Sequence, residues 1–180
     1  MKILIATDIH GSAYYAAKVA EKLKKYNAEQ LILLGDVYNH GPRNPFPKDY
    51  APMQVSDIFN SIAAKITAVK GNCDSEVDQM ISDFPFVSDY VLPFKDRRVY
   101  FTHGHVFNKS NPPATAVEGD LVFYGHFHTS EIAENNGVIC VNVGSASLPK
   151  DGKHAYCLLT DSAIAIYDLN TDEIILQYGF

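Results

Sequence analysis

The first half of the chain alternates short apolar runs with segments that have the spacing of an amphipathic helix. The apolar run 2–7 predicts a buried strand, and the segment 13–26 predicts a helix because its apolar residues recur at every third or fourth position. A second apolar run, 31–34, predicts another strand. Strand, helix and strand in this order predict two parallel strands joined by a right-handed crossover.

A polar, proline-rich loop separates this unit from the next helix. The loop spans 38–52 and has proline at positions 42, 45, 47 and 52. A connection of about fifteen residues is uncommon in a compact domain and is often functional. After the loop, the pattern predicts a helix over 55–66 and a short strand over 67–69.

The second half of the chain has the pattern of a strand meander. Asn135-Asn136-Gly137 has the composition of a tight hairpin turn. No change of composition marks a linker, so we expect one domain over residues 1–180, an α/β fold with two packed sheets and helices outside. The expected strands are 90–92, 98–101, 121–124, 131–133, 138–143, 155–159, 163–167 and 173–177.

Composition and charge narrow the classes of protein that fit this pattern. A hydrophobic content of 47% and a charged content of 20% are those of a globular chain. Fifteen Lys and Arg residues against 21 Asp and Glu residues give a net charge of −6. This balance argues against binding to a nucleic acid polymer or an anionic membrane. A small phosphate ester remains compatible, because bound metal ions supply positive charge locally.

The sequence has three cysteines, Cys73, Cys140 and Cys157, and their spacing does not match any zinc-binding motif. We expect no secretory signal, because Asp8 interrupts the apolar run at the start of the sequence. No apolar run reaches the ~20 residues of a membrane span. These features favour a reduced, cytoplasmic protein.

Candidate metal donors follow the predicted strands in five short groups. A spacing of two residues puts both side chains of a pair on one side of an extended backbone. The ends of parallel strands meet at one rim of a sheet, where ligand sites of α/β proteins form. The groups are Asp8-Ile9-His10, Gly35-Asp36, Gly71-Asn72, His103-Gly104-His105 and His126-Phe127-His128.

Each group taken singly has an ordinary structural explanation. Asn72 beside Gly71 fits a left-handed turn, and His103 and His105 fit loop histidines. The coincidence of five groups, each after a strand, favours a site for divalent metals instead. Oxygen and imidazole donors without cysteine favour Mn²⁺, Fe or Zn²⁺ over Mg²⁺ or Ca²⁺.

In this order the groups resemble the motifs of the calcineurin-like metallophosphoesterases, D-x-H, G-D, G-N-H or G-N-C, H and G-H-x-H. The chain is similar to the small bacterial branch of that family over nearly its whole length. The resemblance implies a two-layer β-sandwich flanked by helices, a four-layer α-β-β-α fold. It also implies two divalent cations, one held by Asp8, His10 and His128 and the other by Asn72, His103 and His126, with Asp36 bridging them.

The resemblance implies a phosphodiesterase in which a metal-bridging hydroxide attacks phosphorus in line. We expect Mn²⁺ as the cation, with Zn²⁺ or Fe as alternatives, and a small phosphodiester as the substrate. Two other activities remain open, those of a phosphomonoesterase and of a dinucleoside polyphosphatase. A non-catalytic interaction scaffold of the same fold is a further alternative, which the seven filled ligand positions disfavour. Aromatic residues in the 38–52 loop and the C-terminal strands indicate self-association as a homo-oligomer.

Three further residues are candidate substrate contacts. Cys73 stands where many family members have a histidine that contacts phosphate. A thiol is a poorer proton donor than an imidazolium to the leaving group. The alternative is that Cys73 is a small buried side chain that only fills space. His105 contacts substrate or supports a ligand through hydrogen bonds. Arg43, in the proline-rich loop, can hold a phosphate in two-pronged fashion, and a solvated loop residue is the alternative.

Overall fold

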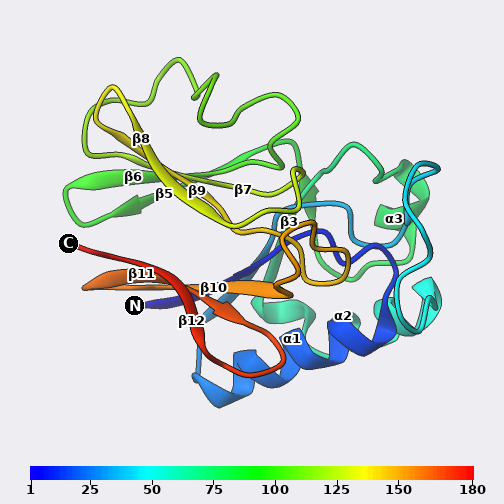
Figure 1. The fold of residues 1–180 in the computed structure, drawn as a ribbon. Helices are drawn as coiled ribbons and strands as arrows, with labels where there is room; N and C mark the ends of the chain where they lie inside the picture. The colour runs from blue at the N-terminus through cyan, green and yellow to red at the C-terminus, as the bar shows by residue number, and fades with distance from the viewer.

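Twelve strands and three helices make up the computed structural model, which describes all residues from 1 to 180 (Figure 1). The helices are α1 (Ala13–Lys25), α2 (Pro52–Asn60) and α3 (Glu76–Met80), and a 3₁₀ turn spans Ala63–Lys65. The strands are β1 (Lys2–Ala6), β2 (Gln30–Leu33), β3 (Ile66–Val69), β4 (Phe86–Val87), β5 (Tyr90–Phe94), β6 (Arg97–Phe101), β7 (Leu121–Tyr124), β8 (Glu131–Asn135), β9 (Val138–Asn142), β10 (Ala155–Thr160), β11 (Ala163–Asp168) and β12 (Ile174–Gly179).

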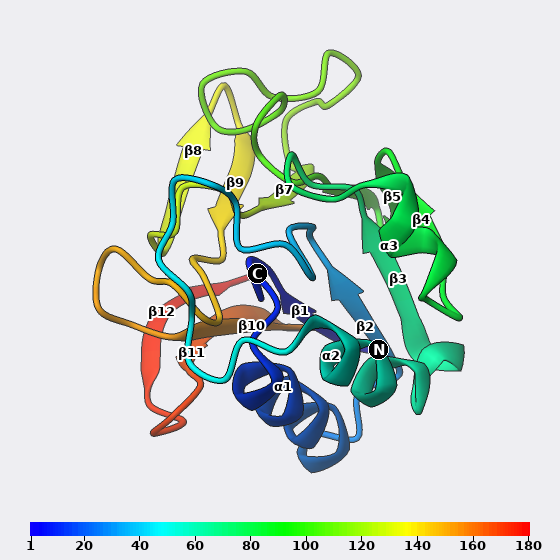
Figure 2. The ribbon, with the colours of Figure 1, turned by 90° about the vertical axis from the view of Figure 1, so that its right-hand side faces the viewer.

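The strands form two sheets that lie face to face (Figures 1 and 2). The seven-stranded sheet has the order β12-β11-β10-β1-β2-β3-β4, and the five-stranded sheet has the order β5-β6-β7-β9-β8. Strands β1 to β4 are parallel, and so are β6, β7 and β9. The predicted α/β class with two packed sheets is confirmed.

Two apolar cores account for the continuous apolar runs of the first strands. Ile3 and Ile5 of β1 lie between the sheets with Phe101 and Phe123. Residues of β1 that alternate with them, such as Leu4, lie between the seven-stranded sheet and helices α1 and α2. A strand buried on both faces needs apolar residues at every position, so these strands lack polar alternation.

Helix α1 begins and ends close to the predicted bounds. The Ser12 side chain accepts a hydrogen bond from the backbone N–H of Tyr15, at 3.3 Å, and so caps the first turn. Lysines occupy the last turn, where positive charge interacts favourably with the helix dipole. Ser12 is separated from the Asp8-Ile9-His10 group only by Gly11, so helix α1 begins just after this group.

The predicted helix 55–66 is wrong at both ends. Pro52 starts the helix at a position where its missing N–H costs nothing, and α2 ends at Asn60. Ile66 belongs to β3 instead, where it lies opposite Leu31 of the parallel strand β2. Pairing with a buried neighbouring strand outweighs the local helical pattern, which does not encode that partner.

Helix α3 and strand β4 were not predicted from the sequence. Helix α3 is five residues long and is started by a capping box in which Ser75 and Asp78 bond to each other's backbone N–H. Strand β4 has two residues and pairs with β3. Elements this short have too few residues to show a period.

The two outer layers of the implied sandwich differ in secondary structure. Helices α1 and α2 cover the outer face of the seven-stranded sheet (Figure 1). The outer face of the five-stranded sheet has a smaller apolar cluster around Tyr100, Val122 and Tyr124, which packs with Ala116 of the irregular segment between β6 and β7. None of the helices has both the length and the apolar character needed to cross a membrane.

Candidate metal centre

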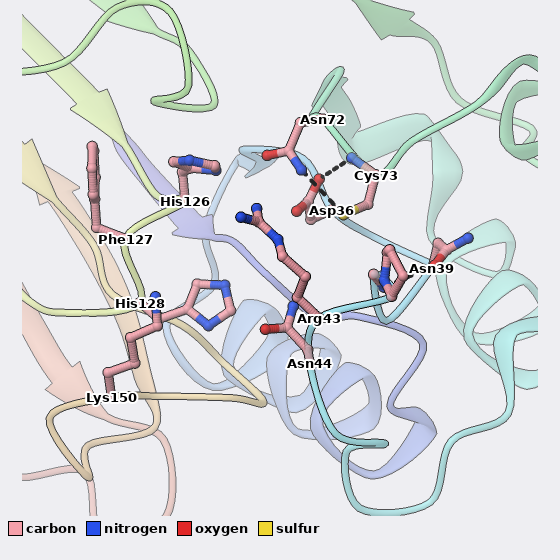
Figure 3. A pocket seen from close by; sticks show the side chains of 12 residues that line it. Asp36, Asn39, Arg43, Asn44, Asn72, Cys73, His126, Phe127, His128 and Lys150 are labelled. Carbon is pink, nitrogen blue, oxygen red and sulfur yellow. Dashed lines mark hydrogen bonds between the residues drawn. The ribbon is translucent and has the colours of Figure 1, made fainter.

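The seven predicted metal ligands converge at the carboxyl ends of the central strands. Asp8 and His10 follow β1, Asp36 follows β2, and Asn72 follows β3. The remaining three come from the second sheet, where His103 follows β6 and His126 and His128 follow β7. Figure 3 shows Asp36, Asn72, His126 and His128 around one pocket.

Asp8 has one carboxylate oxygen that is hydrogen-bonded and one that is not. Oδ2 accepts hydrogen bonds from the Thr7 hydroxyl at 2.7 Å and the His126 backbone N–H at 2.9 Å. Oδ1 is buried without any hydrogen-bond partner and lies 3.2 Å from His128 Nε2 and 3.5 Å from His10 Nε2. The carboxylate is therefore held in place by one oxygen while the other faces the centre.

Three of the four histidines present the same ring nitrogen to the centre. The Nδ1 atoms of His10, His103 and His128 lie 2.8, 2.7 and 2.6 Å from the backbone carbonyl oxygens of Asn39, Leu34 and Leu148. A carbonyl only accepts, so each Nδ1 carries a proton, and in the neutral ring, the form that binds a metal, each Nε2 has a free lone pair. This is the arrangement by which proteins orient metal-binding histidines.

Asp36 lies between the two groups of donors. Its Oδ1 accepts a hydrogen bond from the Cys73 backbone N–H at 2.8 Å. Its Oδ2 lies 3.8 Å from His10 Nε2 and 3.5 Å from His103 Nε2. In the second group of donors, His103 Nε2 lies 3.0 Å from Asn72 Oδ1 and 3.3 Å from His126 Nδ1. One oxygen of Asp36 can therefore serve both groups.

This donor set fits divalent cations. His10 Nε2 and His128 Nε2 lie 3.2 Å apart, and neither carries a proton when its Nδ1 donates to a carbonyl. Two facing lone pairs repel unless a cation or a proton lies between them. Ligands at the 2.0–2.2 Å distances typical of such ions are separated by roughly 3.0–3.4 Å, close to the spacing observed here. The unpartnered Asp8 Oδ1 completes this set.

Five of the seven side chains stand on backbone in the left-handed region. Their φ angles lie between 49° and 68°, in residues that have a Cβ atom. An extended backbone was expected for the pairs spaced by two; instead, Asp8/His10 and His126/His128 lie on tight turns. Such conformations are sparsely populated and cluster at functional sites. The residues are Asp8, His10, Asp36, His126 and His128.

Two glycines allow the loops to approach one another. A Cβ atom at Gly71 would overlap the Asp36 carboxylate, and a Cβ at Gly125 would overlap Thr7 and the Asp8 carboxylate. Neither glycine is needed for a left-handed φ angle. Gly71 therefore serves close packing of the β2 and β3 loops, rather than the sharp turn that its sequence position suggested.

Asp74 is a buried residue that the sequence analysis missed. Its carboxylate accepts hydrogen bonds from the backbone N–H groups of Asp36, Val37 and Gly71, at 2.7, 2.8 and 2.7 Å. It thereby ties the loop after β2 to the loop after β3. Burial, with Asp36 nearby, raises the pKa of Asp74 to about 6, against the opposing effect of these N–H groups. At neutral pH it is ionised and accepts all three bonds.

The loop after β1 is held in a similar way from the C-terminal part of the chain. The hydroxyls of Ser145 and Ser147 donate hydrogen bonds to the Asp8 carbonyl oxygen, at 3.0 and 2.9 Å. No spacing in the sequence connects residues so far apart. These contacts fix the backbone of a predicted ligand without touching the centre.

The charge state of Asp8 suits a metal ligand. Burial alone would raise the pKa of its carboxyl, but the imidazoles of His10 and His128, whose Nε2 atoms lie 3.5 and 3.2 Å from Oδ1, hold this pKa well below its usual range. Asp8 is therefore an anion at any physiological pH. Burial next to Asp36 raises the pKa of the Cys73 thiol to about 12, so Cys73 is a neutral thiol at the same pH.

A cavity of about 770 Å³ opens next to the centre. Its lining is mostly polar and includes two of the predicted substrate contacts, Cys73 and Arg43 (Figure 3). The third predicted contact, His105, is exposed, and it lines a different pocket although its ring centroid lies 5.3 Å from that of His103. Lys150 and Phe127 also line the cavity, and no motif in the sequence marked Lys150.

Comparison with known proteins agrees with this geometry. A family model for the calcineurin-like phosphoesterase superfamily domain matches residues 1–163. Phosphodiesterase YfcE of Escherichia coli K12 is 41% identical over 179 residues, which cover 98% of this chain and 97% of that protein. The solved structure of YfcE superposes with a TM-score of 0.95 at 40% identity and covers 99% of this chain and 98% of that chain.

More distant proteins share the fold. Phosphodiesterase MJ0936 of Methanocaldococcus jannaschii is 26% identical over 151 residues, 80% of this chain and 83% of that protein. The structure of Vps29 from Cryptosporidium parvum has a TM-score of 0.66 at 18% identity over 99% of this chain and 97% of that chain, a likeness of fold alone. The family model and the close match along nearly the whole chain confirm the predicted family of metallophosphoesterase enzymes: the chain belongs to the calcineurin-like phosphoesterase superfamily.

Proposed function

We propose that this chain is a phosphodiesterase that uses two divalent cations to hydrolyse a small phosphodiester. The observation that carries the proposal is the set of seven donor side chains whose free oxygen and nitrogen atoms face one another. The name of YfcE, a phosphodiesterase, supports the same substrate class. A non-catalytic scaffold would have no need for a complete set of donors.

The two groups of donors suggest how the cations are shared. Asp8, His10 and His128, whose donor atoms lie within 4.8 Å of one another, would hold one cation. A second set of three would hold the other, and Asp36, whose Oδ2 lies near both sets, could contribute to each. The second set is Asn72, His103 and His126.

A pair of divalent cations held by these residues would lower the pKa of water to supply a nucleophile at neutral pH and would take up charge on the phosphoryl oxygens. The carboxylates of Asp8 and Asp36 neutralise two of the four positive charges, while the imidazoles and the Asn72 amide are neutral. A residual charge of about +2 therefore attracts an anionic phosphoester to an otherwise acidic chain. The hydrogen bond from the Cys73 N–H to Asp36 Oδ1 leaves Oδ2 directed between the two sets of ligands.

Mixed carboxylate, amide and imidazole donors are compatible with Mn²⁺, Zn²⁺ and Fe, of which we propose Mn²⁺ as the cation. No thiolate is among the seven proposed ligands. We also propose a reducing, cytoplasmic location, which agrees with the three free thiols of Cys73, Cys140 and Cys157. The predicted homo-oligomer stays a prediction.

Substrate class is tested by comparing a diester with a monoester that has the same leaving group. We expect kcat/KM for bis-p-nitrophenyl phosphate to exceed that for p-nitrophenyl phosphate by at least about tenfold in the presence of Mn²⁺. The reason is that the neutral Cys73 thiol gives no positive charge to the dianion of a monoester. Release of p-nitrophenolate is measured with Mn²⁺, Zn²⁺, Fe²⁺ and Mg²⁺ after chelation of the protein. A preference for the monoester with every cation would favour a phosphomonoesterase.

Cys73→His tests whether position 73 limits the range of diesters. A histidine can protonate a poor leaving group, and general acid catalysis contributes about 10²–10⁴-fold. We therefore expect the ratio of 2′,3′-cyclic AMP hydrolysis to bis-p-nitrophenyl phosphate hydrolysis to rise at least tenfold. Cys73→Ser is the matched control, because it keeps the size of the side chain and adds no proton donor of suitable pKa. An unchanged ratio in Cys73→His would mean that Cys73 only fills space.

A further inference from the structure

Two positively charged side chains that line the active-site cavity have no acidic partner. Neither Arg43 nor Lys150 forms a salt bridge, and no side-chain hydrogen bond engages either one. The only carboxylate in the cavity lining is that of Asp36, which faces the proposed metal centre. Both residues are exposed to solvent where they line the cavity, and two unpaired cations at this place, in a chain with a net charge of −6, favour the approach of an anion.

Both side chains stand on loops that are bonded to proposed metal ligands. The Asn39 carbonyl in the loop of Arg43 bonds to His10 Nδ1, and the Lys150 backbone N–H donates to the His128 carbonyl oxygen at 2.8 Å. The two loops reach the cavity from different sides: in Figure 3 Arg43 extends across the opening towards Asn72, and Lys150 rises on the side of His128. The backbone of each loop is therefore anchored to a proposed metal ligand.

The turn that carries Arg43 is stabilised by its neighbours. The Asn39 side chain accepts a hydrogen bond from the Gly41 N–H at 2.8 Å, and the Asn44 side chain donates to the His40 carbonyl oxygen at 2.9 Å. The Asn44 N–H also donates to the Gly41 carbonyl oxygen, at 3.1 Å. An arginine on a turn closed in this way presents its planar guanidinium with less loss of conformational freedom, which suits two-pronged binding of phosphate or carboxylate.

The size of the cavity allows for more than the group that reacts. Cavities of about 300–1,000 Å³ hold ligands of drug or nucleotide size, and this one has about 770 Å³. The cations of the metal centre account for the charge of the scissile phosphate. The positive charges of Arg43 and Lys150 then exceed what is needed to neutralise a singly charged diester.

We propose that Arg43 and Lys150 form a second anion-binding site in the cavity, and that the substrate is a small phosphodiester carrying a further phosphate or carboxylate group. This inference rests on the proposed phosphodiesterase function for its place in the reaction. The second anionic group anchors the arm of the substrate that is not released at the metal centre. It therefore lowers KM for the substrates that carry it.

Binding is tested without catalysis, by calorimetry with nucleotide probes. We expect the protein to bind thymidine 3′,5′-bisphosphate at least tenfold more tightly than thymidine 5′-phosphate. In Arg43→Gln and in Lys150→Gln this ratio of Kd values falls at least threefold, and in the double variant it approaches one. Lys153→Gln is the control, because Lys153 is exposed and unpaired on the same turn as Lys150 but does not line the cavity; it keeps the ratio of the unaltered protein.

A third probe, thymidine 5′-phosphate with a 3′-O-carboxymethyl group, identifies the anion. Tighter binding of both the 3′-phosphate and the 3′-carboxylate probe shows a site for either group, and tighter binding of the bisphosphate alone shows a phosphate site. A ratio near one in the unaltered protein, or a ratio that the double variant leaves unchanged, overturns the proposal.

Turnover gives the second readout. Thymidine 5′-(p-nitrophenyl phosphate) is compared with the same diester bearing a 3′-phosphate, so that the leaving group is identical. We expect the 3′-phosphate to lower KM at least fivefold, and Arg43→Gln and Lys150→Gln to abolish most of this difference. If neither diester is hydrolysed while the calorimetric ratio holds, the proposed function fails and the anion site stands. If both diesters are hydrolysed with equal KM, the proposed function stands and the anion site fails.

Discussion

Asp36→Asn is expected to lower kcat/KM for bis-p-nitrophenyl phosphate by at least about 100-fold. Asparagine has nearly the same volume and can still accept the hydrogen bond from the Cys73 N–H through its Oδ1 atom. It replaces the charged Oδ2, which lies within 3.8 Å of both His10 and His103, by a neutral amide group. Residues that only support metal ligands already cost 10–100-fold when mutated, so a shared ligand costs more.

The measurement has two parts, the rate of p-nitrophenolate release with saturating Mn²⁺ and the number of metal ions per chain. Asp36→Asn is expected to retain fewer ions than the unaltered protein after gel filtration. Asp83→Asn is the matched control, because Asp83 is an exposed carboxylate with no ion pair and lies outside the cavity. Near wild-type activity in Asp36→Asn, with the protein folded, would contradict the two-cation proposal.

Asp74→Ala is expected to lower the free energy of unfolding by roughly 3–5 kcal/mol. The substitution leaves three buried backbone N–H groups without an acceptor, and each unsatisfied group costs about 1–3 kcal/mol. It also releases the loop that carries Asp36 from the loop that carries Asn72. We therefore expect weaker Mn²⁺ binding as well as lower stability.

Asp78→Ala in the same segment is the control for this variant. Asp78 is also a buried carboxylate, but it accepts one backbone hydrogen bond, from Ser75, and caps helix α3. Loss of such a cap costs about 1 kcal/mol. Urea denaturation at neutral pH gives the stability of both variants, and titration with Mn²⁺ under conditions where both are folded gives their metal affinity. Equal losses of stability and affinity in the two variants would show that Asp74 does not tie the loops together.

The elements of the fold were predictable where a long segment had one clear period. Helix α1 has a full amphipathic stripe and a serine cap, and its structure ends one residue before the predicted bound. The hairpin at Asn136 and Gly137 also follows from local chemistry, because both residues adopt the positive φ angles that such a turn requires. Helix α2 was misplaced because the partner of Ile66, strand β2, lies more than thirty residues earlier in the chain.

The identities of the candidate ligands were also accessible from the sequence. Donor residues directly after strands form a local pattern, and parallel strands bring their carboxyl ends together. The manner of approach was not accessible. The pairs Asp8/His10 and His126/His128 stand on left-handed backbone, a conformation that is sparsely populated by residues with a Cβ atom and that their spacing in the sequence does not encode. His105, which shares the His-Gly-His pattern with His103, lies outside the cavity.

The order of strands and of donor groups along one chain thus predicted the fold class and the seven candidate metal ligands, and the resemblance of those groups to known motifs predicted the family. Only the tertiary structure decided what surrounds them: the three N–H groups gathered by Asp74, the serine hydroxyls on the Asp8 carbonyl, and the two unpaired cations of the cavity. The physical reason is distance along the chain. A strand end is specified by its own residues, whereas each of these contacts joins loops whose meeting depends on how both sheets pack.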